Sequence, residues 1–277
     1  MKIFKTHHTV LILADGKYYA TQQNWDTLIN RTHLHAYLRN EIQKLPNAQA
    51  PVETDLLAPI GSQEVWAAGV TYLRSRQARM HESEDSGGAT FYDKVYEADR
   101  PELFFKSMPH RVVRHGGTVN IRKDSAWNVP EPELTLFISS AGTIEAYTIG
   151  NDMSSRSIEG ENMLYLPQAK TYERSAAIGP CLYVPEKPIE PDTSITMEII
   201  RGGKTMYKDQ VQINKMKRTH AELAGWLFRE LTFPHGCFLM TGTCLVPADD
   251  FTLAIGDTVH ITIGGIGTLT NRIGIKD

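Results

Sequence analysis

Apolar and polar residues follow one another in short runs along most of this 277-residue chain, a pattern typical of β-strands. The runs recur between residues 65 and 263, and glycine pairs such as Gly116-Gly117 and Gly264-Gly265 separate them. They are VWAAGV, LFFKS, LTLFIS, IEAYTIGN, PCLYV, SITMEII, CFLMTG and TVHITI. Helical spacing occurs here only at about residues 72–84 and 218–231. The pattern predicts a β-rich mixed α+β fold, arranged as a sandwich or roll.

The first 63 residues have a different pattern. Residues 9–20 read as two strands around Asp15-Gly16, a favoured hairpin turn. Residues 24–45 carry an apolar stripe with roughly helical spacing, and residues 46–63 contain three prolines and little periodicity. We therefore expect a small N-terminal α+β domain with its linker at residues 1–60, and the main domain at residues 61–277.

Charge and cysteine content exclude several classes of protein. The net charge is −3 and the basic residues are spread along the chain, which argues against nucleic acid or a membrane surface as partner. The apolar run in MKIFKTHHTVLIL is too short to span a bilayer, and no small-residue cleavage site follows it. Three cysteines without a CxxC pair favour a reducing, cytoplasmic compartment.

Two carboxylates begin an apolar run in the segment SAWNVPEPELTLFI. Glu131 and Glu133 are two residues apart, so on a strand they share one face with Cβ atoms about 7 Å apart. Ionised carboxylates at that separation repel one another unless a cation lies between them. The alternative is a solvated strand entrance, because Pro130 and Pro132 confine this segment to a strand end or an edge.

A third carboxylate, Asp152, lies about twenty residues further on, in YTIGNDMSSR. That spacing suits two adjacent strands joined by a turn, which would bring Asp152 to the pair. Three carboxylates with open positions favour Mg²⁺, with Mn²⁺ and Ca²⁺ as alternatives. Zinc is disfavoured, because none of the ten histidines lies near the carboxylates or has zinc-ligand spacing.

Two later segments carry further candidates. Lys170 lies in a Gln-Ala-Lys sequence; if it is desolvated near a metal it can act as a general base, and an exposed lysine is the alternative. Thr241 and Thr243 flank Gly242, where the backbone can approach a ligand closely, and a structural turn explains this segment equally well.

The order EPEL, GNDMSSR, QAK, GP and TGT resembles the fumarylacetoacetate hydrolase superfamily over roughly residues 64–270. This resemblance implies a mixed β-sandwich roll of the fumarylacetoacetase C-terminal type, preceded by a variable N-terminal domain. It also implies a divalent metal held by Glu131, Glu133 and Asp152, and at least a dimer, so we expect a homodimer or homotetramer.

Further segments look like the 2-keto-3-deoxy-D-arabinonate dehydratase branch of that superfamily. They are VWAAGVTYLRSRQARM, YDKVYEADRPELFFKSMPHR, DSAWNVPEPEL and IEGENMLYLPQAKTY. The resemblance implies dehydration of a small-molecule 2-keto-3-deoxy-pentonate to 2-ketoglutarate semialdehyde (2,5-dioxopentanoate) in pentose degradation. Lys170 and Glu102 would transfer protons, Thr243 would bind the substrate carboxylate, and Gln168 and Arg76 are further expected substrate contacts.

The same alignment disfavours the superfamily's C–C hydrolases and decarboxylases, which act on fumarylacetoacetate, acylpyruvate or oxaloacetate. Those hydrolases usually carry a His/Glu dyad shortly after a Gly-x-Asn-Tyr turn, and here Ser75 and Ala78 stand at the dyad positions. A six-carbon keto acid as substrate stays open, and so does a non-catalytic binding module. Arg74, Arg76 and Arg79 are interpreted either as a lid over an anionic substrate or as part of a solvated helix.

Overall fold

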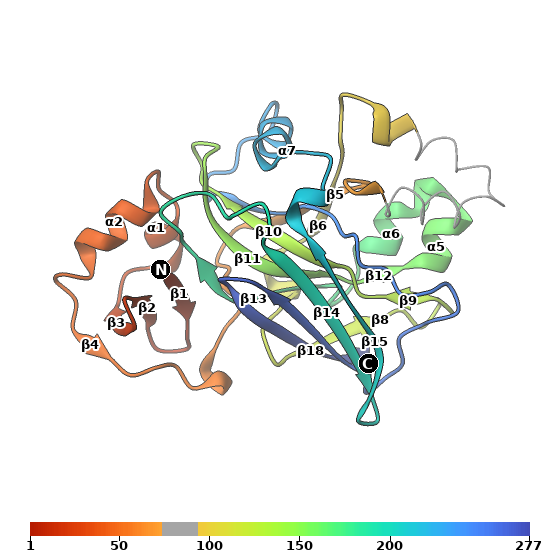
Figure 1. Cartoon of the computed structure of the whole chain (residues 1–277), viewed down its shortest axis with the longest axis horizontal. Coiled ribbons are helices and arrows are strands. Elements are labelled where there is room, and N and C mark those ends of the chain that lie inside the picture. The colour runs from red at the N-terminus through yellow and green to blue at the C-terminus, as the bar shows by residue number, and fades with distance from the viewer. Residues whose placement is uncertain (74–93) are drawn as a thin grey trace.

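The computed structural model describes residues 1–73 and 94–277, and within these residues the chain forms two main β-sheets. The larger sheet has eleven strands in the order β4-β3-β2-β1-β13-β11-β10-β16-β5-β6, with β7 beside β13. The second sheet has five strands in the order β15-β14-β17-β18-β8, and β9 and β12 form a separate pair. Figure 1 shows the N-terminal elements at one end of the molecule and the short helices α5 and α6 at the other.

The strands of the larger sheet are β1 (Lys2–Lys5), β2 (Val10–Ala14), β3 (Lys17–Thr21), β4 (Asn47–Ala48), β5 (Glu64–Gly69), β6 (Glu102–Ser107), β7 (Val112–Val113), β10 (Pro132–Ile138), β11 (Ile144–Asp152), β13 (Ala176–Tyr183) and β16 (Cys237–Met240). Those of the two smaller sheets are β8 (Thr118–Ile121), β9 (Asn128–Val129), β12 (Ser154–Ser155), β14 (Ser194–Arg201), β15 (Lys204–Gln212), β17 (Thr258–Ile263) and β18 (Gly267–Ile275).

The described helices are short. The α-helices are α1 (Trp25–Ile29), α2 (Leu34–Glu41), α5 (Arg156–Glu161), α6 (Leu166–Lys170) and α7 (His220–Leu227), and residues 94–97 are also helical. The 3-10 turns are η1 (Glu53–Asp55), η2 (Pro109–Arg111), η3 (Met163–Tyr165) and η4 (Ile213–Lys215). None of the described helices is both long and apolar enough to cross a membrane.

Alternation along the central strands divides the core into two layers. On β10, Leu134 and Leu136 belong to the cluster shared with the five-stranded sheet, which supplies residues such as Met197 and Ile261. Phe137 points to the other face and joins the cluster formed with α1 and α2. Burial on both faces explains why β10 reads as a continuous apolar run. The expected sandwich of two sheets is confirmed, with all eight predicted runs forming strands.

The polar strand β15 was not predicted, because its residues alternate between exposed and half-buried positions at the edge of the second sheet. The predicted helix at residues 218–231 is shorter, and a capping box between Thr219 and Glu222 begins it. Most of the predicted helix at 72–84 lies outside the described residues.

The apolar stripe at residues 24–45 forms two helices in place of one. The chain turns between α1 and α2, where Asn30 donates a hydrogen bond to the carbonyl of Pro234 and accepts one from the amide of Ser140. His33 takes a left-handed conformation with φ of 55°, and the carboxylate of Glu145 accepts from the first amide of α2. The apolar spacing alone predicts one continuous helix, and these contacts with distant segments interrupt it.

The N-terminal strands continue the larger sheet. β1 pairs with β13 in antiparallel register, and the amino group of Met1 donates a 2.9 Å hydrogen bond to the carbonyl of Val184. The helices α1 and α2 cover one face of the same sheet. The division of the chain between residues 60 and 61 therefore stays a prediction, because the two parts share one sheet and one core layer.

Candidate metal centre

The register of β10 and β11 brings three carboxylates together. The backbones of Glu131 and Asp152 exchange two hydrogen bonds, of 3.2 and 2.9 Å, so these residues stand directly opposite one another. Glu133 lies two residues further along β10, opposite Gly150. All three side chains consequently share one face at one end of the strand pair, as the spacing of about twenty residues predicted.

These carboxylates form a compact and buried group. One oxygen from each of Glu131, Glu133 and Asp152 lies within 4.8 Å of the others, and the residues are only 4%, 1% and 1% exposed. Burial, and secondly the negative charges of Asp152 and Glu131, raise the pKa of Glu133 well above its ordinary value. The alternative of a solvated strand entrance is therefore wrong.

Lys170, the last residue of α6, points into this group and is fully buried. Its Nζ donates to Glu131 Oε2 at 2.6 Å, to Asp152 Oδ2 at 3.1 Å and to the hydroxyl of Ser154 at 2.6 Å. The alternative of an exposed lysine is wrong as well. Lys170 is a desolvated amine in contact with two of the three clustered carboxylates.

Three more buried charged residues complete the surroundings, and the sequence patterns did not predict them. Lys106 on β6 forms an ion pair with Asp152 and donates to the carbonyls of Met153 and Lys170. Burial lowers the pKa of Lys106, and the charge of Asp152 opposes that effect. The lysine inside the apolar run LFFKS was the one signal for it.

Arg156 and Glu159 are the other two, both on α5 directly after the GNDMSS segment. Arg156 Nη2 lies 2.6 Å from Glu131 Oε1, and Arg156 Nη1 lies 3.6 Å from Glu159 Oε2. Glu159 Oε1 lies 3.4 Å from the amine of Lys170. Their spacing of three residues places both on one side of a helix, which the sequence could have shown.

The turn at residues 241–243 closes the opposite side of the group. Gly242 has a φ of 97°, a conformation that L side chains rarely adopt, and its amide donates a 2.5 Å hydrogen bond to Glu133 Oε2. A Cβ at Gly242 would collide with the hydroxyl of Thr71. Thr243 is buried and lines the same pocket. We expected the backbone at Gly242 to approach a ligand closely, and in the structure it approaches the carboxylate of Glu133.

The remaining predicted residues lie at different distances from this pocket. Glu102 on β6 is half-buried and pairs with Gly69, and a Cβ on Gly69 would collide with the Glu102 carboxylate. Since Gly69 lines the pocket, Glu102 stands at its edge. Gln168 is exposed on α6 and does not line the pocket. Arg76 lies outside the described residues, as do Arg74 and Arg79 and the positions Ser75 and Ala78.

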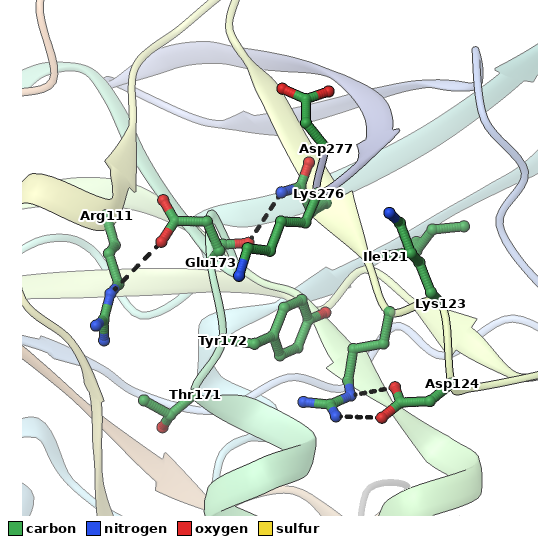
Figure 2. A pocket seen from close by; sticks show the side chains of 11 residues that line it. Arg111, Ile121, Lys123, Asp124, Thr171, Tyr172, Glu173, Lys276 and Asp277 are labelled. Carbon is green, nitrogen blue, oxygen red and sulfur yellow. Dashed lines mark hydrogen bonds and ion pairs between the residues drawn. The ribbon is translucent and has the colours of Figure 1, made fainter.

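Two cavities are lined by neighbouring residues of the segment that carries Lys170. The carboxylate pocket holds about 10 Å³, roughly the space of one water molecule. A cleft of about 660 Å³ is lined by residues such as Tyr172, which follows Lys170 by two positions. Arg122 also lines this cleft and donates two hydrogen bonds, of 2.8 and 2.6 Å, to Asp124, which Figure 2 labels. Arg111 faces Glu173 across a 3.7 Å ion pair.

The donor set of the small pocket suits a hard divalent cation. Three carboxylates supply oxygen ligands, which Mg²⁺ and Ca²⁺ prefer. No histidine or cysteine is among the described residues that line the pocket, so it lacks the ligands typical of zinc. A cation there would offset the repulsion among the carboxylates, which adds to the effect of burial in raising the pKa of Glu133.

A β-rich two-sheet fold and a buried carboxylate trio with an inserted lysine define a metal-dependent enzyme class. The chain belongs to the fumarylacetoacetate hydrolase family, whose C-terminal domain matches residues 65–274. The expected fold and family are thereby confirmed.

Several known proteins are similar to this chain over most of its length. A probable 2-keto-3-deoxyxylonate dehydratase of Haloferax volcanii is 48% identical over 223 residues, which cover 80% of this chain and 76% of the relative. The 2-dehydro-3-deoxy-D-arabinonate dehydratase of Saccharolobus solfataricus is 43% identical, over 78% of this chain and 73% of the relative. A structure of 2-keto-3-deoxy-D-arabinonate dehydratase complexed with magnesium and 2,5-dioxopentanoate is 32% identical, with a TM-score of 0.85 over 100% of this chain and 99% of that one.

Proposed function

We propose that this protein is a Mg²⁺-dependent dehydratase that converts a 2-keto-3-deoxy-pentonate to 2,5-dioxopentanoate, in the degradation of pentose sugars. The single observation that carries the proposal is the amine of Lys170 at hydrogen-bond distance from two clustered carboxylates. The names of the relatives and the ligands of the similar structure support the same reaction. Mn²⁺ and Ca²⁺ have no such support, so Mg²⁺ is the proposed ion.

The proposed site has Glu131, Glu133 and Asp152 as the residues that hold the ion. When bound, the ion would hold the 2-keto acid end of the substrate and make its C3 protons more acidic. Lys170 then removes a C3 proton, because its amine lies beside the ion's ligands, and it needs to be neutral when it does so. Elimination requires a second group that protonates the leaving C4 hydroxyl. The resulting C3–C4 alkene then loses one proton from C5 and one from the C5 hydroxyl and gains one each at C3 and C4, which gives 2,5-dioxopentanoate.

Glu102 is the proposed acid for that hydroxyl, because its carboxylate stands at the edge of the pocket over Gly69. Thr243, with its hydroxyl in the pocket lining, is proposed to bind the substrate carboxylate. Gln168 and Arg76 stay predicted substrate contacts without structural support, one being exposed and the other outside the described residues. The small free volume of the pocket means that side chains move when substrate enters.

An NMR time course with Mg²⁺ and 2-keto-3-deoxy-D-pentonate tests this proposal. We expect 2,5-dioxopentanoate to appear, and EDTA to stop its formation. A parallel sample with acetylpyruvate tests the alternative, a metal-dependent C–C hydrolase or decarboxylase. Release of acetate and pyruvate with the sugar acid unchanged would contradict the dehydratase.

The variant Glu102→Gln tests the protonation of the C4 hydroxyl separately from the removal of the C3 proton. This variant retains Lys170, so it should still exchange the C3 protons of substrate with deuterium while it loses product formation. Lys170→Met should lose both. Equal dehydration by Glu102→Gln and the wild-type protein would remove Glu102 from the mechanism.

Three further proposals concern the whole molecule. We propose a homodimer or homotetramer, which light scattering after size exclusion tests. A cytoplasmic location is proposed because no disulfide joins the three cysteines, of which Cys181 and Cys237 are buried. The family match beginning at residue 65 supports the proposed domain boundary near residue 60.

A further inference from the structure

Both carboxylate oxygens of Glu131 are already engaged by cations. Arg156 Nη2 lies 2.6 Å from Oε1, and Lys170 Nζ lies 2.6 Å from Oε2. All three side chains are at most 5% exposed, so water does not screen their charges. Charge-assisted hydrogen bonds of this length are strong. A metal ion that binds Glu131 therefore meets two positive charges at its ligand.

The pocket also has little free space for an additional ion. The free volume of about 10 Å³ accommodates one small ion or water, with the amine of Lys170 at the same carboxylate oxygen. A divalent cation on Glu131 Oε2 at the usual distance of about 2.1 Å would lie close to that ammonium group. Because the two positive charges repel strongly in a buried site, an ion on Glu131 favours movement of the Lys170 ammonium group away from that carboxylate.

Glu159 offers the displaced cations another anion. Its Oε1 lies 3.4 Å from Lys170 Nζ, and its Oε2 lies 3.6 Å from Arg156 Nη1. Both separations are within ion-pair range and longer than the 2.6 Å contacts with Glu131. Glu159 is 2% exposed and is not one of the three clustered carboxylates. A short movement of either cation would therefore exchange Glu131 for Glu159.

We propose that Glu159 is a positioning residue that receives Lys170 and Arg156 when a divalent ion takes Glu131. The charges of the pocket agree with this role. Among the described residues, four buried carboxylates face three buried cations there: Glu131, Glu133, Asp152 and Glu159 face Lys106, Arg156 and Lys170. Without the charge of Glu159, Lys170 and Arg156 would lose the anion that lies 3.4 and 3.6 Å from them. The inference rests on the proposed metal site.

Binding of Mn²⁺, followed by the EPR signal of the free ion, tests the role of Glu159. Glu159→Gln keeps the side-chain shape but removes the charge, and we expect Mn²⁺ affinity to fall about 10–100-fold. Glu161→Gln is the matched control, because Glu161 is an exposed carboxylate on the same helix, and its affinity should equal that of the wild type. Equal affinity in Glu159→Gln and Glu161→Gln would overturn the inference. Wild-type protein that binds no Mn²⁺ would overturn the metal site itself, a separate result.

A crystallographic comparison of the wild-type protein covers the case in which Glu159→Gln does not fold. In crystals grown with EDTA, Lys170 and Arg156 should contact Glu131 as they do here. In crystals soaked with Mn²⁺, at least one of these cations should lie within about 3 Å of Glu159, at hydrogen-bond length, and further from Glu131. Loaded crystals in which both cations keep their contacts with Glu131 would rule out the exchange.

Discussion

The carboxylate pocket and the larger cleft contain the same kinds of charged residues in opposite environments. In the cleft the paired Arg122 and Asp124 side chains are 19% and 64% exposed, whereas no side chain of the Lys106–Asp152 pair exceeds 1%. The cleft is about 660 Å³ in volume, and the pocket is about 10 Å³. The larger cavity is thus the one whose charges water can solvate.

This difference supports the carboxylate pocket, and not the cleft, as the proposed active site. Exposed ion pairs contribute little to stability and form readily on any surface. Buried charges are costly unless each one has a partner, so a group of them at one strand end signals a functional requirement. By volume alone the cleft would be the candidate active site, whereas the burial of its charged residues favours the pocket.

The largest effect is expected from Lys170→Met. This change removes the proposed base from the pocket, so turnover should fall by about 10²–10⁴-fold. Mn²⁺ binding should persist, because the three carboxylates remain. Activity is measured by NMR with the 2-keto-3-deoxy-pentonate, and near-normal turnover would show that the pocket lysine is not the base.

Lys106→Met should cause the largest loss of stability. It leaves Asp152 without its buried ion pair, and the free energy of unfolding in EDTA should fall by about 3–5 kcal/mol. Lys5→Met is the control, because Lys5 is a half-buried lysine that donates to the carbonyl of Ile60 and does not line the pocket. Urea denaturation compares the two, and similar losses would mean that burial near the carboxylates has no special cost.

Addition of Mg²⁺ should stabilise the wild-type protein by about 2.7 kcal/mol at a free concentration roughly 100 times its Kd. Glu133→Gln, which lacks one of the three ligands, should lose most of this gain. Thermal unfolding with Mg²⁺ and with EDTA measures the difference. A gain that survives in Glu133→Gln would place the ion elsewhere.

Without metal, the pH dependence of the free energy of unfolding should distinguish the wild-type protein from Glu133→Gln. Burial and the neighbouring charges raise the pKa of Glu133 above its ordinary value of 4.5, so the folded protein holds a proton that the unfolded chain releases. The wild-type protein consequently loses stability as pH rises from about 4.5 toward the folded-state pKa. In EDTA, the free energy of unfolding of Glu133→Gln should fall less between about pH 5 and pH 8. Parallel curves would contradict the raised pKa.

The smallest effect is expected in the cleft. Asp124→Asn breaks an exposed pair with Arg122, and the free energy of unfolding should change by no more than about 1 kcal/mol, with turnover unchanged. A loss of activity comparable to that of Lys170→Met would show that the cleft takes part in the reaction, and the contrast between the two cavities would fail.

Local patterns predicted most of the strands and the core of the site. The alternation of side chains put Glu131 and Glu133 on one face, and the turn length brought Asp152 opposite Glu131. Both depend on neighbouring strands, so the period of the backbone and the short connection decide them. The division of the 24–45 stripe into α1 and α2 could not be predicted in this way. Hydrogen bonds to Pro234 and Glu145, which are distant in sequence, stabilise the turn between the two helices.

Which charges meet the carboxylates is a property of the tertiary structure. Lys106 belongs to β6, and the sheet order places β16 and β5 between β6 and β10, yet its amine reaches Asp152. Residue types and spacing name a candidate lysine or carboxylate, but they do not show whether water surrounds it. Packing of the two sheets and α6 removes that water, and desolvation turns Lys170 from an ordinary surface cation into a buried partner of Glu131 and Asp152.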